Sequence, residues 1–352
     1  MRRLVLPAVL ITAVAAAAQT AAPEEPELLR AQRAVLEQIR AEAAALGPMK
    51  TSFAQRFLDA TARLPILAPR LPTFSNDNDS RWYTYAEAAA LGATFELKKH
   101  ELDVSFYWNT HYGTPVAYAR ALDLAASRDL AANPAVLDFG CGGLGAPRLL
   151  ASCGCRVVGV DVDPRLRVLY SEEEDTGLIM NATPGGRTGE LSLVIGQWPA
   201  DAHAADKVKA AVPGGVDLFL SRNTLKNGYI HPAEPVDPRR LVHLGVSDEE
   251  FVGAVFAALK PGGLFMIYNI CPAPAAAGQP YIPWADGHCP FPREALEAAG
   301  FQVLDFDVVD DEPARAMGHA LGWDEGEGAM KLKDDLFAWF TVARRPAAGG
   351  PK

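Results

Sequence analysis

Uninterrupted runs of apolar residues recur through the last two thirds of the chain, and stretches of helical length separate them. An apolar run without polar alternation is typical of a parallel strand that is covered on both faces. Seven such strands with intervening helices predict an α/β, doubly wound, mostly parallel sheet. The predicted strands are 136–137, 156–160, 191–196, 216–221, 264–270, 301–309 and 336–342.

One helix of this sheet domain has sequence signals at both of its ends. Ser247 and Glu250 have the spacing of a capping box at the start of a helix predicted over 248–259. The proline and two glycines at 261–263 are expected to stop this helix before the next strand begins. The helix and the strand that follows it are therefore predicted as one αβ unit.

The first hundred residues have a different pattern, with helical periodicity and proline breaks. Helices are predicted over 26–46 and 51–63, and the polar stretch 75–80 is predicted to be a turn or a flexible link. These pieces lack a core of their own. We therefore expect residues 24–106 to form a helical extension that packs as a lid on a main domain over 107–345.

Residues 1–18 have the composition of an export signal, with two arginines, a mostly apolar stretch and three alanines before Gln19. The apolar stretch is shorter than the about 20 residues that a comfortable membrane span requires. We expect an exported protein, periplasmic or secreted, with no stable membrane span once the signal is cleaved. A membrane-anchored and a cytoplasmic protein are the alternatives. The tail, 346–352, is expected to be disordered.

A glycine-dense loop and two acids mark a nucleoside-binding unit between residues 136 and 164. Asp138 ends the first predicted strand, and Gly140 opens a loop where side chains would block the close approach of a ligand. Asp161 ends the second strand, 21 residues after Gly140, a spacing at which a carboxylate can bind both ribose hydroxyls. An acid inside the first turn would repel the pyrophosphate of a dinucleotide, whereas it would attract the ammonium and sulfonium of S-adenosylmethionine.

The sequence resembles the class I (Rossmann-like, seven-stranded) S-adenosylmethionine-dependent methyltransferases. The resemblance rests on DFGCG at 138–142, VGVD at 158–161 and the phrase LKPGG at 259–263, and it covers the main domain. In one departure, the usual third glycine of the loop falls at Leu144, and Gly145 follows one place later. The resemblance implies that the seventh strand is antiparallel and lies between the fifth and the sixth.

The resemblance also implies S-adenosyl-L-methionine as the cofactor and assigns its contacts. Gln197 and Trp198 follow the third strand, where the family contacts adenine, so the amide would bond the exocyclic nitrogen and the indole would stack on the ring. His111 and Tyr112 would cover the methionine end or pack the lid on the sheet, and Thr114 is expected to cap the helix that follows. The implied cofactor-binding residues are Asp138, Gly140, Cys141, Gly142, Gly143, Asp161, Val162, Gln197, Trp198, Ser221 and Tyr112.

The loop after the fourth strand is the expected place for catalytic side chains, because ligands of open α/β sheets lie beyond the carboxyl ends of the strands. Methyl transfer is an in-line displacement that depends mostly on positioning, and a general base helps where the acceptor is a hydroxyl or an amine. Asn223 could orient the acceptor or the cofactor, and Lys226, Tyr229 or His231 could accept a proton. Exposed loops carry such residues without catalytic reason as well.

Composition limits the partners. The formal net charge is −10, and the loss of residues 1–18, which hold two arginines and no acid, would leave −12. No basic cluster offsets this charge, so the expected partner is a small-molecule or protein methyl acceptor and not a nucleic acid. Of the five cysteines at least one is unpaired, and Cys271 with Cys289 is the pair to test. No CxxC or HExxH spacing occurs, and Cys289 near Asp286 and His288 is more typical of a polar loop than of a metal site.

Two other classes of function remain open at this point. An NAD-dependent oxidoreductase would share the sheet, but Asp138 would repel its dinucleotide. An exported, non-catalytic binding protein on the methyltransferase scaffold would agree with the predicted export signal. An aminopropyl transferase would also bind a sulfonium nucleoside, but the paired acids that would hold a polyamine are not evident after the fourth strand. The sequence does not indicate the oligomeric state.

Overall fold

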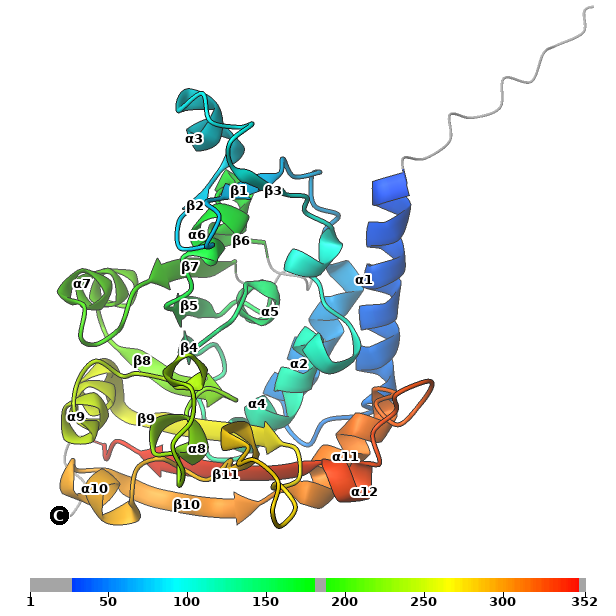
Figure 1. The fold of residues 1–352 in the computed structure, drawn as a ribbon. Coiled ribbons are helices and arrows are strands. Elements are labelled where there is room, and N and C mark those ends of the chain that lie inside the picture. Colours follow the sequence, from blue (N-terminus) through cyan, green and yellow to red (C-terminus); the bar gives the residue numbers. More distant parts are fainter. Residues whose placement is uncertain (1–26, 181–187, 348–352) are drawn as a thin grey trace, which may run out of the picture.

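An eight-stranded sheet forms the centre of the main domain (Figure 1). The computed structural model describes residues 27–180 and 188–347, so the predicted signal at 1–18 and most of the tail at 346–352 lie outside the described residues. Across the sheet the strands are β10 (Gln302–Val309), β11 (Phe337–Arg344), β9 (Leu259–Cys271), β8 (Val216–Arg222), β4 (Ala135–Phe139), β5 (Arg156–Asp161), β7 (Gly189–Ile195) and β6 (Gly177–Ile179).

The directions of the strands agree with the expected topology, apart from one additional strand. β7, β5, β4, β8 and β9 are parallel neighbours, and β11 is antiparallel to both β9 and β10. β11 is therefore the antiparallel seventh strand, inserted between the fifth and the sixth. The prediction of seven strands is wrong by one, because β6 pairs antiparallel with the edge strand β7. This strand has only three residues, too few to produce a recognisable apolar run.

Each face of the sheet is covered by its own hydrophobic core. In β8 the side chains of Leu218 and Leu220 belong to one core and that of Phe219 belongs to the other, as the alternation of side chains along a strand requires. All three side chains are fully buried. The uninterrupted apolar sequence of this strand is thus explained by two covered faces.

Helices on both faces supply the other half of each core (Figure 1). The first core includes residues of α4 (Tyr118–Ala126), α5 (Gly145–Ser152), α6 (Arg165–Leu169) and α11 (Asp311–Ala320). The second core includes residues of α7 (Ala202–Ala211), α9 (Asp248–Ala258) and α10 (Arg293–Ala298). The one-turn helices α8 (Asn227–Ile230) and α12 (Leu332–Asp335) complete the main domain.

The start of α9 agrees with its sequence signal, but its end does not. The Ser247 hydroxyl accepts a hydrogen bond from the Glu250 amide, and the Glu250 carboxylate accepts one from the Ser247 amide, which completes the capping box. The helix ends at Ala258, and the segment 259–263 already belongs to β9. The predicted helix, 248–259, is therefore one residue too long, and the strand begins five residues before its predicted start at 264.

The amino-terminal extension is only partly helical, which corrects the expectation. It contains α1 (Glu27–Ala45), α2 (Ser52–Asp59) with a 3-10 turn (Ala60–Arg63), and α3 (Tyr85–Ala90). It also contains a three-stranded antiparallel sheet of β1 (Thr73–Ser75), β2 (Trp82–Tyr83) and β3 (Lys98–His100). The polar stretch 75–80 contains the last residue of β1 and most of the turn between β1 and β2, as predicted. Strands of two or three residues leave no periodicity for sequence analysis to detect.

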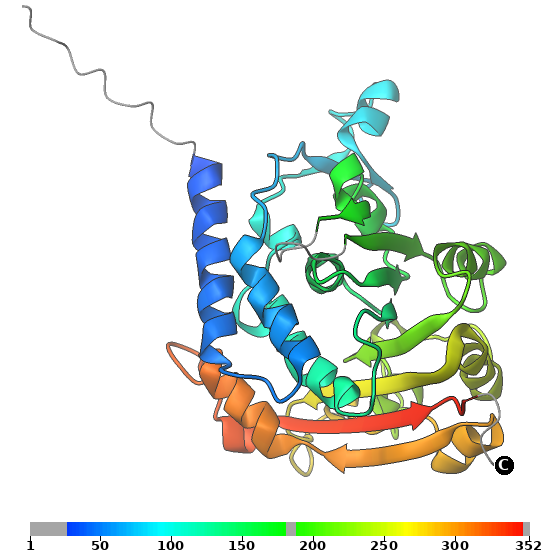
Figure 2. The same cartoon turned by 180° about the vertical axis from the view of Figure 1, so that it is seen from behind.

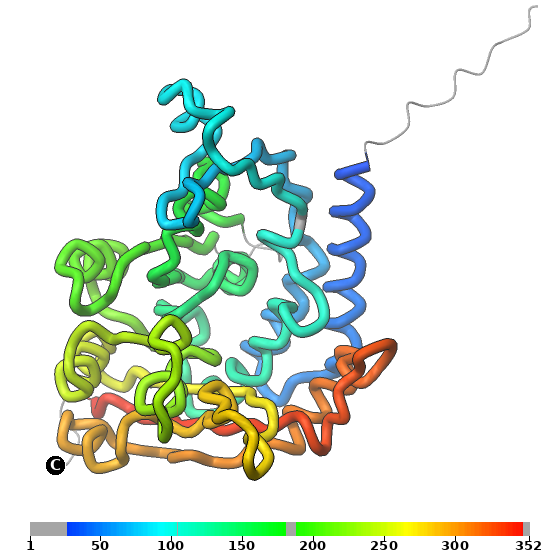
Figure 3. Tube along the Cα trace, in the orientation of Figure 1, coloured from blue at the N-terminus to red at the C-terminus, as the bar shows by residue number. Residues whose placement is uncertain are grey.

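The extension is packed firmly on the main domain. Buried residues of α1 and α2 belong to the first core, and α2 packs against α4, as the view from behind shows (Figure 2). Arg70 donates two hydrogen bonds to the buried Asp175 carboxylate, at 2.9 and 2.7 Å, which joins the linker after α2 to the main domain. Along the chain trace, the end of α1 approaches α11 although the two are far apart in sequence (Figure 3). None of the described helices is long and apolar enough to cross a membrane.

Candidate cofactor site

The loop between β4 and α5 forms part of the walls of two neighbouring cavities at the carboxyl ends of the parallel strands. Gly140 has a φ of +72°, and a Cβ at this position would lie 2.1 Å from Thr224 Oγ1, so only glycine fits. The Gly140 amide donates to the Val160 carbonyl at 2.8 Å, which holds the loop against β5. A Cβ at Gly142 would meet no atom within 4 Å, so this part of the loop faces open space.

The departure from the family's third glycine is resolved by the position of Gly145. Leu144 is fully buried in the first core and precedes α5. A Cβ on Gly145 would lie 2.6 Å from the Tyr107 carbonyl oxygen, so the close approach of two backbones occurs at this residue. The loop thus keeps a glycine where packing requires one, displaced by one place.

The larger cavity, of about 590 Å³, contains most of the residues that were expected to contact adenosine. Val162 is 65% exposed and contributes an apolar side chain to the wall of this cavity. The Gln197 amide nitrogen donates to the His243 carbonyl at 2.8 Å, so its oxygen remains for a ligand. The lining residues are Phe139, Gly140, Val160, Asp161, Val162, Gly196, Gln197, Trp198, Thr224, Leu241, Val242 and His243.

Trp198 is oriented differently from the expectation. Its side chain is buried, and its ring packs in the second core against Phe139, Phe219 and Phe251, with ring centroids 5.5 to 6.2 Å apart. The residue still lines the cavity, but its ring already has aromatic neighbours. We therefore assign Trp198 to the wall of the cavity rather than to stacking on a free face.

Asp161 lies on the same cavity and holds the glycine loop. Its Oδ2 accepts a hydrogen bond from the Gly142 amide at 2.8 Å, and its Oδ1 accepts one from the Asp163 amide at 3.0 Å. Each oxygen of an ionised carboxylate has a second lone pair, so both can still accept a bond from a ligand hydroxyl. The carboxylate is therefore fixed in place before any ligand binds.

The smaller cavity, of about 240 Å³, lies on the other side of Gly140. Its walls come from the glycine loop, from the segment 106–118 that precedes and enters α4, and from the tip of β8. The extension contributes only Phe106 to these walls. The lining residues are Phe106, Tyr107, Asn109, Gly113, Thr114, Pro115, Tyr118, Gly140, Cys141, Gly142, Gly143, Gly145, Ala146, Tyr170 and Arg222.

Asp138 is fully buried beside this smaller cavity, next to the lining residues Tyr118 and Arg222. Neither oxygen of the carboxylate has a hydrogen-bond partner of normal geometry. Burial raises the pKa of Asp138 from 3.8 to about 7, and the nearby Tyr118 hydroxyl and Arg222 guanidinium partly oppose this rise. A buried acid without partners is costly, so a ligand that brings a positive charge would relieve it.

Arg222 was missed by the sequence analysis, although it follows the predicted site residue Ser221. Its Nε is buried without a partner, and among the described residues its guanidinium forms no hydrogen bond or ion pair. The guanidinium carbon lies 5.1 Å from the centroid of the Tyr118 ring, a cation-π contact. A positive charge at the tip of an apolar parallel strand is the signal that could have identified it. The small cavity therefore has a cation, Arg222, in its wall and a buried acid, Asp138, behind that wall, and neither has a hydrogen bond of normal geometry.

The comparisons with known proteins show no relative by sequence. No family model and no curated protein matches this chain. Among solved structures it is similar to the [4+2]-cyclase SpnF, at 18% identity over 69% of this chain and 86% of that chain, with a TM-score of 0.35. An S-adenosylmethionine dependent methyltransferase from Mesorhizobium loti is 17% identical over 60% of this chain and 91% of that chain, with a TM-score of 0.34. A precorrin-6y C5,15-methyltransferase from Geobacter metallireducens is 14% identical over 69% and 97%, with a TM-score of 0.35.

These values are too low to support a conclusion about activity, so the assignment of the fold rests on the molecule itself. The parallel strands, the antiparallel strand β11 between β9 and β10, and the glycine loop after β4 are all in the expected places. The chain has the Rossmann-like methyltransferase fold. The remaining predicted residues can now be placed on this fold.

Two predicted cofactor contacts lie elsewhere. Tyr112 is half exposed and its hydroxyl donates to the Trp323 carbonyl at 3.2 Å, so it lines a third cavity together with His111. The 3-10 turn at His111–Gly113 carries both side chains away from the glycine loop. Ser221 is fully buried, and its hydroxyl accepts from the Leu225 amide at 3.1 Å instead of lining either cofactor cavity. Thr114 precedes the predicted helix start, but its hydroxyl makes no capping bond.

Each of the four predicted catalytic side chains already interacts with another part of the protein. Asn223 has a φ of +64°, and its side-chain oxygen accepts from the Ile270 amide at 2.7 Å. The Lys226 ammonium is buried and donates to the carbonyls of Ile270, at 2.7 Å, and Trp284, at 3.3 Å. Burial lowers the pKa of Lys226. These bonds attach the loop after β8 to the end of β9.

Tyr229 and His231 lie farther along this loop. The Tyr229 ring lies over the Lys226 ammonium, with 5.6 Å between the nitrogen and the ring centroid, and burial raises the pKa of its hydroxyl. The His231 Nε2 pairs with Asp248 at 2.8 Å, and the imidazole is about half exposed. None of the four residues lines the two cofactor cavities. The structure thus gives no support to any of them as a general base.

No metal site is found among the described residues, where no group of three or more His, Cys, Asp or Glu side chains could hold an ion. Asp286 instead accepts from the Asn227 amide at 2.7 Å and pairs with His288 at 2.8 Å. All five cysteines are free, so Cys271 and Cys289 are not bridged. Cys141 lines the smaller cavity, where burial raises the pKa of its thiol.

Proposed function

We propose that this protein binds S-adenosyl-L-methionine in the two cavities beside the glycine loop and transfers its methyl group to a small-molecule or protein acceptor. The observation that carries the proposal is the Arg222 guanidinium in the wall of the small cavity together with the Asp138 carboxyl group buried behind that wall, neither of which has a hydrogen bond of normal geometry. An α-amino acid has a positive ammonium and a negative carboxylate on one carbon atom. The methionine part of the cofactor is therefore complementary in charge to this end of the crevice.

The other cavity fits the adenosine part. Asp161 offers a fixed carboxylate at the place where ribose hydroxyls would donate, and Gln197 has a free side-chain oxygen for the amino group of adenine. Gly140 lines both cavities, so one ligand could extend across it from one to the other. The order of the groups is that of a nucleoside joined to an amino acid.

A dinucleotide is a poorer fit to the same crevice. Its pyrophosphate would carry two negative charges to the glycine loop, beside the buried Asp138 carboxylate. Arg222 is the one cation among the residues of the smaller cavity. The oxidoreductase alternative is thus disfavoured by charge, although it would use the same type of sheet.

The residues of this chain contribute mainly position. When bound, the cofactor would supply an electrophilic methyl group on a sulfonium. The glycine loop, Asp161 and the two charged groups would fix the cofactor at both ends, so that the methyl group faces the acceptor in one orientation. The loop after β8 supports this arrangement, because its polar side chains bond to β9 and hold the strand tip that carries Arg222.

The proposal is tested by calorimetric titration of the full chain with S-adenosyl-L-methionine. Asp138→Asn and Arg222→Gln are each expected to weaken binding by about tenfold or more, since each removes a charge-assisted contact of about 1.5–3 kcal/mol. The matched controls are Asp129→Asn and Arg239→Gln, whose side chains are 95% and 89% exposed. Unchanged affinity in both crevice variants, or binding of NAD in place of S-adenosyl-L-methionine, would contradict the proposal.

The same protein tests whether binding leads to transfer. A radiolabelled methyl group from the cofactor should appear in a fraction of small molecules or proteins incubated with the wild-type chain. Tight cofactor binding without transfer to any fraction would instead favour the non-catalytic binding protein on the same scaffold.

A further inference from the structure

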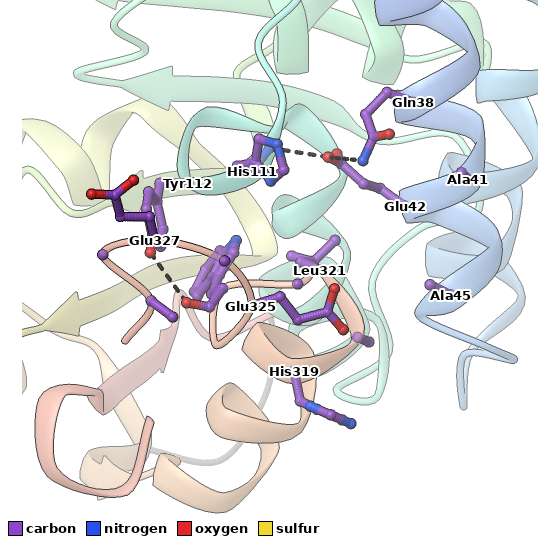
Figure 4. Close-up of a pocket in the computed structure, with 16 residues that line it drawn as sticks. Gln38, Ala41, Glu42, Ala45, His111, Tyr112, His319, Leu321, Glu325 and Glu327 are labelled. Atoms are coloured by element: carbon purple, nitrogen blue, oxygen red, sulfur yellow. Dashed lines mark hydrogen bonds between the residues drawn. The ribbon is translucent and has the colours of Figure 1, made fainter. Parts of the chain in front are cut away.

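A third cavity, of about 680 Å³, lies between the extension and the main domain, and it shares no residue with the two cofactor cavities. Its walls come from α1, from the turn at His111–Gly113 and from the segment 319–329, which comprises the end of α11 and the loop after it (Figure 4). These three segments are distant in sequence. The cavity therefore exists only because the extension is packed in place.

The charge of this cavity is negative. Glu42, Glu325 and Glu327 line it, and neither lysine nor arginine is among its lining residues. His319 also lines it, but its imidazole is paired at 2.8 Å with Asp324, which adds a further carboxylate nearby. The Asp324 carboxylate raises the pKa of His319, but this imidazole is already paired, so the three glutamates leave the cavity attractive to a positively charged ligand.

Glu42 is the side chain that distinguishes this cavity from an ordinary acidic surface. It is 3% exposed, and Figure 4 shows its carboxylate projecting from α1 toward His111. Its Oε1 accepts hydrogen bonds from the His111 amide at 3.0 Å and from the Gln38 amide nitrogen at 3.2 Å. Its Oε2 is buried and has no partner. A buried acceptor of this kind is costly unless a donor reaches it.

Trp323 provides a second unsatisfied group in the same wall. Its side chain is 3% exposed, and its indole Nε1, a donor, is buried without a partner. Its ring lies 5.5 Å from that of Tyr112, and the two rings are tilted by 49°. Aromatic rings in this arrangement present faces that attract cations as well as apolar chains.

We propose that this cavity is a binding site for an organic molecule with a protonated amine and a nearby hydroxyl or carbonyl oxygen. The amine would donate to Glu42 Oε2, and the oxygen would accept from Trp323 Nε1. The rings of Tyr112 and Trp323 would contact the carbon chain between the two groups. The proposal does not depend on the proposed methyl transfer, because the two sites use different residues.

A metal ion is the main competing occupant, and the geometry disfavours it. No group of three or more potential metal ligands is found among the described residues, here or elsewhere. One of the two Glu42 oxygens is already occupied by two donors. An amine needs only one strong acceptor and accepts an aromatic wall, which a hydrated divalent ion does not favour.

The test uses calorimetric titration of the full chain with Nα-acetyl-lysine methyl ester, which has one protonated amine and several carbonyl oxygens. Nα-acetyl-norleucine methyl ester, which lacks the amine, is expected not to bind. Glu42→Gln should weaken binding of the lysine ester by about tenfold or more. Glu37→Gln, an exposed position on the same helix, is the matched control and should bind as the wild type does.

A second variant separates loss of the site from loss of the fold. Trp323→Phe keeps the aromatic ring and removes the N–H, so it should weaken the lysine ester several-fold and leave the binding of n-butylamine, which has no oxygen, unchanged. Unfolding temperatures of all variants establish that they are folded. Equal binding of the two esters, unchanged affinity in a folded Glu42→Gln chain, or displacement of the ester by Mn²⁺ would overturn the proposal.

Discussion

Two adjacent residues at the tip of β8 behave in opposite ways. Arg222 enters the small cavity, and among the described residues its guanidinium has neither a hydrogen bond nor an ion pair. Asn223, the next residue, has its side-chain oxygen bonded to the Ile270 amide, and Lys226 is bonded to two carbonyls. The Arg222 guanidinium thus lacks hydrogen bonds within the described residues, whereas the side chains of Asn223 and Lys226 have theirs.

This difference separates residues that are available to bind a ligand from residues that stabilise the fold. A polar group that the protein already satisfies contributes to the fold, and using it for a ligand would break a bond that is present. A polar group that is buried and unsatisfied lowers the stability of the fold, and a ligand can recover that cost. By this criterion Asp138 and Arg222 are the groups open to the proposed cofactor, while Asn223, Lys226 and His231 are already bonded within the protein.

The largest effect is expected from Asp138→Asn in the protein without cofactor. The pKa of Asp138 is raised from 3.8 to about 7 in the folded state, so the folded protein binds the proton more tightly than the unfolded chain does. The stability that this provides is present below pH 4 and is lost as the pH rises through 7. Asparagine does not titrate, so the variant should gain stability relative to the wild type over this interval, by roughly 3–4 kcal/mol.

The measurement is chemical unfolding of both chains at several pH values between about 4 and 8. The exposed Asp129→Asn variant should show no such change with pH relative to the wild type. If the difference between Asp138→Asn and the wild type is constant across this range, the Asp138 carboxylate is not uncompensated, and only Arg222 is left as an unsatisfied group at the small cavity.

The sequence was sufficient for the sheet and for the two acids because both are local patterns. Apolar runs identify buried strands, and the interval from Gly140 to Asp161 is fixed by one strand, one helix and one turn. Asp138 is the second-last residue of β4 and Asp161 is the last residue of β5, close to the predicted strand ends. The short strand β6 and the small sheet of the extension were missed, because strands of two or three residues are too short to show a repeating pattern of apolar and polar positions.

The sequence could not show which polar side chains are already hydrogen-bonded within the folded protein. Asn223 and Lys226 bond to residues more than 40 positions later, and nothing in their own neighbourhood indicates this. Tyr112 was assigned to the cofactor, but a single turn directs it to Trp323, 211 positions away. Residue type indicates which chemistry is available, whereas only the packed structure shows whether that chemistry is already in use.

A smaller effect is expected from Lys226→Met, on the supporting side of the contrast. Methionine has a similar length, but it leaves the carbonyls of Ile270 and Trp284 without this donor. We expect a loss of about 1–3 kcal/mol in the free energy of unfolding and little change in cofactor affinity. A general base at this position would give the reverse result, with intact stability and abolished methyl transfer. Unfolding and titration of the same preparation separate the two roles.

The smallest effect is expected at His231, because its pair with Asp248 lies at the surface, where the imidazole is 46% exposed. Exposed ion pairs contribute about 0–1 kcal/mol, so His231→Ala should change the unfolding midpoint only slightly. Cofactor affinity and the pH profile of methyl transfer should match those of the wild type, since His231 lines neither cofactor cavity. If the variant instead lost methyl transfer with its cofactor affinity intact, His231 would move during turnover to where it accepts a proton. Side chains of the loop after β8 that are bonded within the protein would then also act in the reaction. The presence of such bonds would no longer distinguish supporting residues from residues that bind or react.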